Sequence, residues 1–455
     1  MRRTSTLRPS SSPVSPVRLF VLADCSNFYV ACERAFDPTL EGRPVVVLSN
    51  NDGCVVARSE EVKRLGVTMA APYFKVRDQL AAAGTEVFSS NYPLYANLSR
   101  RITTVLSTFT DEIERYSIDE AFLRARPRTQ AEAEALGHAI RARVLQWTGI
   151  PMRVGLGPTK TLAKVASERA KALRDAGQPP VLCLWNEAHR NQALRGLPVR
   201  EVWGVGPRWA KRLAARGVFS AADFAALPDV WIKHEMSIVA LRTAYELRGI
   251  SCLPLDLVPG VRKTLVRSRS FGRPVTAHAE LQHALATHTA RAGEKLRGEG
   301  LVAGGIEAYV TTKRFGRGPH RTLSATALLT PRTLDTRRLL QTVRGLLRRM
   351  YVPAAPDGTP FRWKKAGVTL FDLVREVPTQ THLFDAGPTP EHRALLDAVD
   401  AANQRWGRRT VVWGSQGTPR KHTPTETGHA WSMRQAYRSA RYTTDWDDLL
   451  RVFAR

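Results

Sequence analysis

Runs of apolar residues place the first structural elements of the chain. Residues 19–24, with the sequence LFVLAD, form a short apolar run that ends in a carboxylate, which is typical of a buried strand with a functional residue at its tip. Residues 44–49, PVVVLS, form a second run of this kind. We expect further strands over 114–123, ERYSIDEAFL, and over 152–157, MRVGLG.

Helical spacing of apolar residues appears between and after the last two of these strands. Thr129 and Glu132 form a capping-box pattern that predicts the start of a helix. A second helix is expected over 161–173, TLAKVASERAKAL. Strand, helix, strand and helix in this order predict a layered α/β or α+β domain. The expected apolar face of the first helix consists of Leu136, Ile140, Val144 and Trp147.

Changes in composition divide the remainder of the chain. The sequence GQPP at 177–180 closes the layered unit, and residues 197–227 predict two short helices around a glycine hairpin. From about 262 to 375, strands and helices rich in Arg and Lys predict a separate basic α+β domain. The segment 376–455 contains Gly, Pro and Thr-rich stretches and is expected to be partly disordered.

Net charge is the bulk property that narrows the function most. The chain has 68 Lys and Arg residues against 41 Asp and Glu residues, a formal net charge of +27. This surplus is spread along the chain and predicts a polyanionic partner, because neutralising phosphates releases counterions. A ribosome-associated protein and a generally basic proteome remain open on composition alone.

Other bulk features describe a globular protein of a reducing compartment. A length of 455 residues with 43% hydrophobic content predicts roughly two to four domains. No apolar run approaches the ~18 residues of a membrane span, and residues 1–17 lack the apolar core of a signal peptide. The five cysteines form no C-x-x-C pair, so we expect no disulfide framework, no zinc site and a cytoplasmic location. We interpret His278, His283 and His288 as surface residues.

Carboxylates in strand contexts are the strongest candidates for chemistry. Asp24 ends one apolar strand, and Asp119 and Glu120 lie within another. Buried carboxylates are costly unless they are paired or bind a metal, and hard oxygen ligands suit Mg²⁺. Two such ions can support phosphoryl transfer. Strand alternation, however, points Asp119 and Glu120 to opposite faces, so both reach one site only if the strand bends or ends there.

Aromatic and basic residues near these carboxylates have both a functional and a structural interpretation. Phe28 and Tyr29 could stack on a nucleotide or exclude a 2′-hydroxyl, or they could belong to the core. Lys160 and Lys164 stand one turn apart at a helix start, where backbone N–H groups and ammonium charges favour phosphate. A solvated basic helix face is the alternative.

Two further short segments are candidates for contacts with large partners. The hairpin of Gly204, Val205 and Gly206 could present backbone amides to a DNA phosphate, although a lone G-x-G is usually only a turn. The segment QTHLF at 380–384 could anchor the chain in a partner's groove.

Taken together, these segments resemble the Y-family DNA polymerases, and among them the UmuC type, the catalytic subunit of bacterial DNA polymerase V. The resemblance runs in family order from about residue 19 to the C-terminus. Its segments are DCSNFYVACE, GRPVVVLSNNDGCVVARS, FSSNYPLY, YSIDEAF, GPTKTLAK, VWGVGPR, RSRSFG, KKAGVTL and RYTT followed by DLLRV.

The resemblance implies an α+β multidomain fold, a right-hand polymerase with palm, fingers and thumb plus a little-finger domain and a flexible C-terminal tail. The implied boundaries are 1–17 for a disordered leader, 18–27 and 89–184 for the palm, 28–88 for the fingers, 185–250 for a thumb with a helix-hairpin-helix element, 251–375 for the little finger and 376–455 for a partner-binding tail.

The same resemblance implies roles for individual residues. Asp24, Asp119 and Glu120 would be catalytic and would hold two Mg²⁺ ions, assisted by the carbonyl of Cys25. Tyr29 matches the steric gate that rejects ribonucleotides. The further expected contacts are Asn27, Phe28 and Lys164 for the nucleotide, Gly204, Val205 and Gly206 for DNA, and Gln380, Leu383 and Phe384 for a sliding clamp.

The fingers depart from the family pattern at two positions. Many members carry Tyr-x-x-Arg before the Gly-Val of the fingers, and both residues contact the triphosphate. The matching positions here hold Glu60 and Lys63. Lys63 can act as a point charge without bidentate geometry, and Glu60 cannot assist a phosphate. Arg58 is a candidate substitute.

The leading functional hypothesis is therefore a template-directed DNA polymerase that copies past damaged bases in the cytoplasm, at the nucleoid. Its expected partners are primer-template DNA, a deoxynucleoside triphosphate, the sliding clamp, a UmuD-type dimer and a RecA filament. One alternative is a non-catalytic adaptor that binds DNA and the clamp, and such relatives lose the acidic residues. Another is a nucleotide cyclase, in which the thumb hairpin and the large basic domain would have no role.

Overall fold

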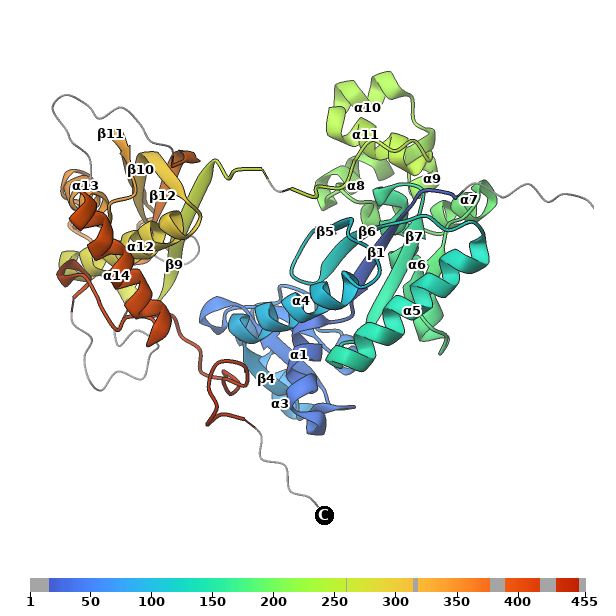
Figure 1. Ribbon diagram of the computed structural model, residues 1–455, viewed down its shortest axis with the longest axis horizontal. Helices are drawn as coiled ribbons and strands as arrows, with labels where there is room; N and C mark the ends of the chain where they lie inside the picture. Colours follow the sequence, from blue (N-terminus) through green and yellow to red (C-terminus); the bar gives the residue numbers. More distant parts are fainter. Residues whose placement is uncertain (1–15, 259, 314–317, 377–388, 418–430, 450–455) are drawn as a thin grey trace, which may run out of the picture.

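The computed structural model describes residues 16–258, 260–313, 318–376, 389–417 and 431–449 of the chain. These residues form sheets of five, three and four strands and a group of short helices, arranged as separate units (Figure 1). We name the units palm, fingers, thumb and little finger, after the predicted architecture. None of the helices in these ranges is long and apolar enough to cross a membrane.

A five-stranded sheet with the order β5-β6-β1-β7-β8 forms the centre of the palm. β1 is buried along its whole length because helices cover both faces of the sheet. Leu19 and Val21 face α5, whereas Phe20 and Leu22 face α6. The elements are β1 (Leu19–Cys25), β5 (Ile113–Arg115), β6 (Glu120–Ala125), α5 (Gln130–Thr148), β7 (Met152–Gly157), α6 (Lys160–Asp175) and β8 (Val181–Cys183).

Gly155 in β7 lets α6 lie directly against the sheet. A Cβ atom at this position would lie 2.2 Å from the carbonyl oxygen of Ala163 and 2.3 Å from the backbone nitrogen of Ser167. No side chain fits there without moving the helix backbone. The close approach brings the first turns of α6 to the edge of the sheet where β1 and β6 meet.

The palm confirms most of its predicted elements and corrects two details. The strands expected at 19–24 and 152–157 are present in the palm, and the one expected at 44–49 is present in the fingers. The Thr129 hydroxyl accepts a hydrogen bond from the Glu132 N–H at the start of α5. The continuous strand expected over 114–123 is wrong, because a bend at 116–119 separates β5 from β6. Trp147, expected on the apolar face of α5, is 59% exposed. The buried face instead continues through Ala133 and Gly137.

The fingers consist of a small sheet with helices around it. Its order is β3-β2-β4, with β2 antiparallel to β3 and parallel to β4. The helices α1 and α4 pack against each other where fingers and palm meet. The elements are α1 (Phe28–Phe36), η1 (Pro38–Leu40), β2 (Val45–Leu48), η2 (Asn50–Asp52), β3 (Val55–Arg58), α2 (Glu60–Arg64), α3 (Tyr73–Ala82) and β4 (Glu86–Ser89). The palm continues after them with α4 (Tyr92–Leu106), which also contacts α5.

Short helices form the thumb, whose core includes one side of α6 through Leu162, Val165 and Ala166. The predicted glycine hairpin precedes α8 and follows a 3₁₀ turn, so one of the two flanking helices is shorter than expected. The elements are α7 (Glu187–Arg195), η3 (Val199–Glu201), α8 (Pro207–Ala214), α9 (Ala221–Ala226), α10 (Asp229–Glu235) and α11 (Ile238–Leu247).

The little finger is an antiparallel sheet with the order β11-β10-β12-β9, and two long helices cover one face. An extended connection that begins at residue 251 links it to the thumb (Figure 1). The elements are β9 (Thr264–Val275), α12 (His278–Gly298), β10 (Leu301–Thr312), β11 (Thr322–Thr333), α13 (Thr336–Met350) and β12 (Trp363–Arg375).

The C-terminal region contains ordered elements within the described residues 389–417 and 431–449. Residues 390–405 form helix α14 (Pro390–Arg405), followed by η4 (Gly414–Gln416). The guanidinium of Arg297 in α12 donates to both carboxylate oxygens of Asp400 in α14, at 2.7 and 2.8 Å. The tail that was expected to be partly disordered thus contains an ordered helix that is tied to the little finger. The proposed clamp segment 380–384 and residues 1–15 of the leader lie outside the described residues.

Cysteine and histidine positions test two further expectations. All five cysteines are free, as predicted. His288, however, is 5% exposed inside α12 and packs edge-on near Trp431, so its assignment to the surface is wrong. Burial, reinforced by the charges of nearby arginines, lowers the pKa of His288 to about 3.

The buried His288 predicts acid sensitivity of the fold. In the unfolded chain the imidazole gains a proton below about pH 6.5, but in the folded chain it stays neutral down to a pKa of about 3. Its contribution to stability is therefore complete above the unfolded pKa and is lost as pH falls towards the folded pKa. Between pH 7 and pH 5, the wild type should lose about 2 kcal/mol more stability than His288→Phe. Thermal melting at both pH values measures this difference.

His138→Phe, at an exposed position of α5, provides the control and should keep the wild-type pH dependence. An identical pH dependence for His288→Phe and wild type would contradict a neutral, buried imidazole.

Candidate active site

Strand pairing brings the first two predicted carboxylates side by side. In the palm sheet, Asp24 at the end of β1 is paired with Glu120 at the start of β6. On the other side of β1, the same residue is paired with Arg153 of β7. Directly opposed residues of an antiparallel pair project to the same face. Asp24, Glu120 and Arg153 therefore lie in a row on the face of the sheet that carries α6.

The bend between β5 and β6 brings the third carboxylate to the same place. Asp119 precedes the strand, so it is free of the alternation that would turn it away from Glu120. The N–H of Cys25 donates to the carbonyl oxygen of Asp119 at 2.9 Å, which ties the bend to the end of β1. The Ser117 hydroxyl donates to the Asp119 carboxylate at 2.5 Å. All three predicted catalytic residues thus lie at one corner of the palm.

Burial and the neighbouring charges of the carboxylate corner together set the pKa of Asp24. Asp24 is 5% exposed. Burial raises its pKa, the guanidinium of Arg153 lowers it, and the negative charges of Glu120 and Asp119 raise it further, with a net value of about 6. A divalent cation between these groups would offset the repulsion from Glu120 and Asp119, which adds to the effect of burial on this pKa.

Basic side chains now neutralise two of the three carboxylates. Arg153 donates to one Asp24 oxygen through Nη2 at 2.6 Å and Nε at 3.1 Å. The ammonium of Lys164, from α6, lies 2.9 Å from Glu120. As these side chains lie, no three His, Cys, Asp or Glu residues in the described ranges are arranged to bind a metal ion. The donor set of oxygen ligands nevertheless suits a hard dication, which would take the place of these cationic partners.

Helix α6 corrects one part of the predicted phosphate site. Lys160 is 5% exposed and forms an ion pair with Glu114, so it faces the interior. The first amides of α6 are also occupied, because the Thr159 side chain accepts from Leu162 and the buried Glu246 carboxylate accepts from Thr161. Two of the first amides of α6 are therefore already paired, and of the two lysines only Lys164 contacts the carboxylate corner.

An aromatic cage surrounds Lys164. Its ammonium lies 4.5 Å from the ring centroid of Tyr116 and 5.3 Å from that of Trp203 in the thumb. The Trp203 ring N–H donates to the Tyr116 hydroxyl at 3.2 Å. Cation–π contacts of this kind hold the lysine at the junction of palm and thumb.

The two aromatic residues at the start of α1 lie in different places: Phe28 is in the core, and Tyr29 is near the carboxylate corner. Phe28 is 3% exposed and belongs to the palm core. Tyr29 is half-buried and stacks on Tyr95, with ring centroids 4.3 Å apart. Burial first, then the neighbouring Tyr92 and Asp119, raises the pKa of Tyr29 to about 12. Tyr29 therefore keeps its hydroxyl neutral next to the carboxylate corner.

The unusual residues of the fingers form a network with the palm. Glu60 accepts hydrogen bonds from Asn27 at 3.0 Å, from Lys63 at 2.8 Å and from Arg174 of α6 at 2.8 Å. Burial raises the pKa of Glu60, but the bonds from Lys63 and Asn27 and the two positive charges outweigh it, so the net pKa is lowered. Glu60 thus holds two cations and the cap of α1 together at the boundary between fingers and palm.

Two other nucleotide candidates have different surroundings. The guanidinium of Arg58 donates to the carbonyl oxygen of Val67 at 2.7 Å, a contact within the fingers. Asn27 caps α1 in the left-handed region, with φ of 48° and ψ of 44°. Its side chain donates a hydrogen bond to Glu60, so it belongs to the network between fingers and palm.

The thumb hairpin has the backbone that the sequence predicted. Gly204 has φ of +89°, a conformation that favours glycine, and Gly206 is the N-cap of α8. Val205 is buried and anchors the hairpin in the thumb core. The clamp candidates Gln380, Leu383 and Phe384 lie in a part of the chain that the structure does not describe.

Sequence reasoning missed Arg153 and Trp203. Arg153 lies within a strand whose neighbours Met152 and Val154 are buried, so the argument applied to Asp24 would have marked it as a buried charge that needs a partner. Trp203 comes from the thumb, and no local pattern links it to Lys164.

Comparisons with known proteins identify the family. The chain matches the model of the impB/mucB/samB family over residues 23–168 and that of the family's C-terminal domain over residues 262–383. Protein UmuC of Salmonella typhimurium is 38% identical over 438 residues, which cover 95% of this chain and 100% of that protein. The chain belongs to the impB/mucB/samB family.

Further relatives and a solved structure agree with the predicted fold. Protein SamB of Salmonella typhimurium is 37% identical over 95% of this chain and 99% of its own length. DNA polymerase IV of Moorella thermoacetica is 29% identical over 86% of this chain and 94% of its own length. A Y-family DNA polymerase chimera of Dbh and Dpo4 matches with a TM-score of 0.61, at 20% identity over 79% of this chain and all of that one. The Y-family resemblance and the α+β polymerase fold are thus confirmed.

The C-terminal region also has a counterpart among known families. Residues 393–452 match a domain of unknown function, DUF4113. This match includes residues 393–405 of α14 and the described segment 431–449, both of which lie in the expected partner-binding tail.

Proposed function

We propose that the protein is a template-directed DNA polymerase that performs error-prone synthesis past damaged bases. The observation that carries the proposal is the convergence of Asp24, Asp119 and Glu120 at one corner of the palm sheet. Membership of the impB/mucB/samB family and the Y-family fold support it. The alternative of a non-catalytic adaptor has no specific support, because the acidic residues are all retained.

The carboxylates would hold two Mg²⁺ ions, with the Cys25 carbonyl as a further ligand. Bound magnesium supplies the charge that activates a 3′-hydroxyl and stabilises the leaving pyrophosphate. The residues themselves position the reactants. Lys164 would leave Glu120 and pair with the triphosphate of the incoming nucleotide. Its aromatic cage would keep the ammonium group beside the carboxylate corner.

The surroundings of the site suit a nucleic-acid substrate. The chain has a net charge of +27, and the Gly204–Gly206 hairpin in the thumb could hold a DNA phosphate through backbone amides. The sliding clamp, a UmuD-type dimer and a RecA filament are further proposed partners, and action at the nucleoid in the cytoplasm follows from them. The similarity to Protein UmuC supports the UmuD-type partner.

Primer extension with the purified full chain tests the activity. Asp119→Asn with Glu120→Gln should reduce nucleotide incorporation to background on undamaged and abasic templates, because the metal site loses two of its three charges. DNA binding should remain close to that of the wild type. Extension by the double variant would refute the assigned site. An inactive wild type that stays inactive with a UmuD-type dimer and a RecA filament would refute the polymerase proposal and favour the adaptor.

The two lysines of α6 provide a matched pair for the triphosphate contact. Lys164→Met should raise KM for the deoxynucleotide about tenfold, the cost of one charged phosphate contact, with little change in the melting temperature. Lys160→Met should instead lower the melting temperature, because it leaves the carboxylate of Glu114 without its buried partner. Steady-state kinetics and thermal melting measure both. An unchanged KM in Lys164→Met would contradict the proposed contact.

A further inference from the structure

A segment near the C-terminus connects the little finger to the fingers. We call residues 431–442 the C-terminal strap. At its start, Trp431 is buried in the little-finger core near Phe271, and the N–H of Gly272 donates to the Ser432 carbonyl at 3.1 Å. From there the chain runs to the fingers, as Figure 1 shows for the red segment that ends beside α1 and β4.

Buried polar groups of the fingers depend on the strap for partners. The N–H of Ala436 donates to the Asp52 carboxylate at 2.9 Å, and the N–H of Tyr437 donates to the Ser89 hydroxyl at 3.0 Å. The N–H of Ser89 in turn donates to the Tyr437 carbonyl at 2.8 Å. Asp52 and Ser89 are 7% and 1% exposed. Since unpaired buried polar groups are costly, the strap is an integral part of the fingers.

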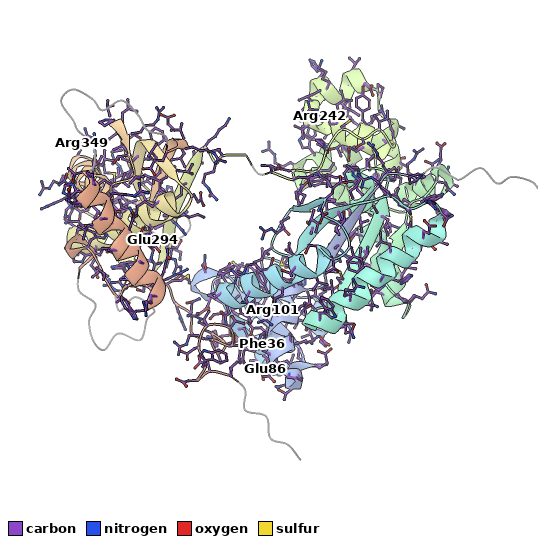
Figure 2. The ribbon with its side chains drawn as sticks, in the orientation of Figure 1. Phe36, Glu86, Arg101, Arg242, Glu294 and Arg349 are labelled. Atoms are coloured by element: carbon purple, nitrogen blue, oxygen red, sulfur yellow. The ribbon has the colours of Figure 1, made fainter. Side chains whose placement is uncertain are left out.

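The strap also contacts α1, the helix that carries Tyr29. The side chain of Ser439 lies close to Glu33, which is 1% exposed in the middle of the helix, and counteracts the effect of burial on the pKa of that carboxyl group. The Ser439 hydroxyl also accepts a hydrogen bond from the Asn91 side chain at 3.0 Å. At the end of α1, the rings of Phe36 and Tyr442 stack with centroids 5.0 Å apart (Figure 2 labels Phe36).

A continuous set of contacts leads from this point to the nucleotide site. Glu33 accepts a hydrogen bond from the Tyr95 hydroxyl at 2.6 Å, and Tyr95 is fully buried. The ring of Tyr95 stacks on that of Tyr29 at an interplanar angle of 13°. Ser439, Glu33, Tyr95 and Tyr29 therefore form one chain from the strap to the residue that faces the carboxylate corner.

We propose that the C-terminal strap positions Tyr29, with Ser439 and Tyr95 as positioning residues for discrimination against ribonucleotides. This inference rests on the proposed function and extends it, because it assigns part of the sugar selection to a segment more than 400 residues away from the site in sequence. The Tyr29 ring can exclude a 2′-hydroxyl by its bulk only if the ring is held in a fixed position. A hydrogen-bonded Tyr95 behind the Tyr29 ring provides that rigidity.

The ratio of kcat/KM for a deoxynucleotide to that for the matching ribonucleotide tests the inference in the full chain. Ser439→Ala should lower this ratio about threefold to tenfold, the factor that corresponds to the net loss of one hydrogen bond. The change should come from faster ribonucleotide incorporation, with deoxynucleotide kcat/KM within about twofold of wild type. Tyr95→Phe keeps the stacked ring and removes only the hydroxyl, so it should lower the ratio in the same way.

Controls separate this role from a general effect on the fold. Thr444→Ala, at an exposed position just beyond the strap, should leave the ratio unchanged. The double variant Ser439→Ala with Tyr95→Phe should show less than the product of the two single effects, because both act on one chain of contacts. An unchanged ratio in both single variants, or an equal loss with both nucleotides, would overturn the inference. A wild type that incorporates neither nucleotide, even with the UmuD-type dimer and the RecA filament present, would instead refute the proposed function.

Discussion

The register of β1 against its two neighbours is the constraint on which the rest of the site depends. Pairing Asp24 with Glu120 on one side and with Arg153 on the other places two carboxylates and a guanidinium in a row at a buried position. A shift of one residue would send Asp24 to the face of α5 and separate it from both partners. The central strand is buried on both faces, which leaves this register little freedom, since a shift would also expose or invert its apolar side chains.

Charge then connects the sheet with the helix behind it. The close approach that Gly155 permits brings Lys164 to Glu120, and the thumb contributes Trp203 to the surroundings of the same lysine. Lys164 therefore links the palm and the thumb, through an ion pair with Glu120 and a cation–π contact with Trp203. At the opposite boundary, Glu60 joins Asn27 of the α1 cap and Lys63 of the fingers to Arg174 of the palm. Where the family pattern has a neutral tyrosine, this chain has Glu60, and Arg174 of α6 provides a positive charge that pairs with it.

Local patterns were sufficient for some of this arrangement and insufficient for the rest. The strand at 19–24 and the capped helix after Thr129 follow from apolar runs and capping, which depend on neighbouring residues only. The bend at 116–119 escaped prediction because Tyr116, Ile118 and Phe122 favour an extended chain, whereas the ties of Asp119 to Cys25 and Ser117 are made by folding. Long-range packing likewise buries His288, pairs the Thr161 amide of α6 with Glu246 and holds residues 434–442 against the fingers. The roles of the carboxylates came from the family resemblance, since alternation alone argued against a shared site.

Anomalous diffraction from Mn²⁺ in crystals of the full chain with primer-template DNA and an incoming nucleotide tests the central claim most directly. The account predicts manganese bound by Asp24, Asp119 and Glu120, with the ammonium of Lys164 moved from Glu120 to the triphosphate. Manganese bound elsewhere, or an intact contact between Lys164 and Glu120 beside a bound nucleotide, would contradict it.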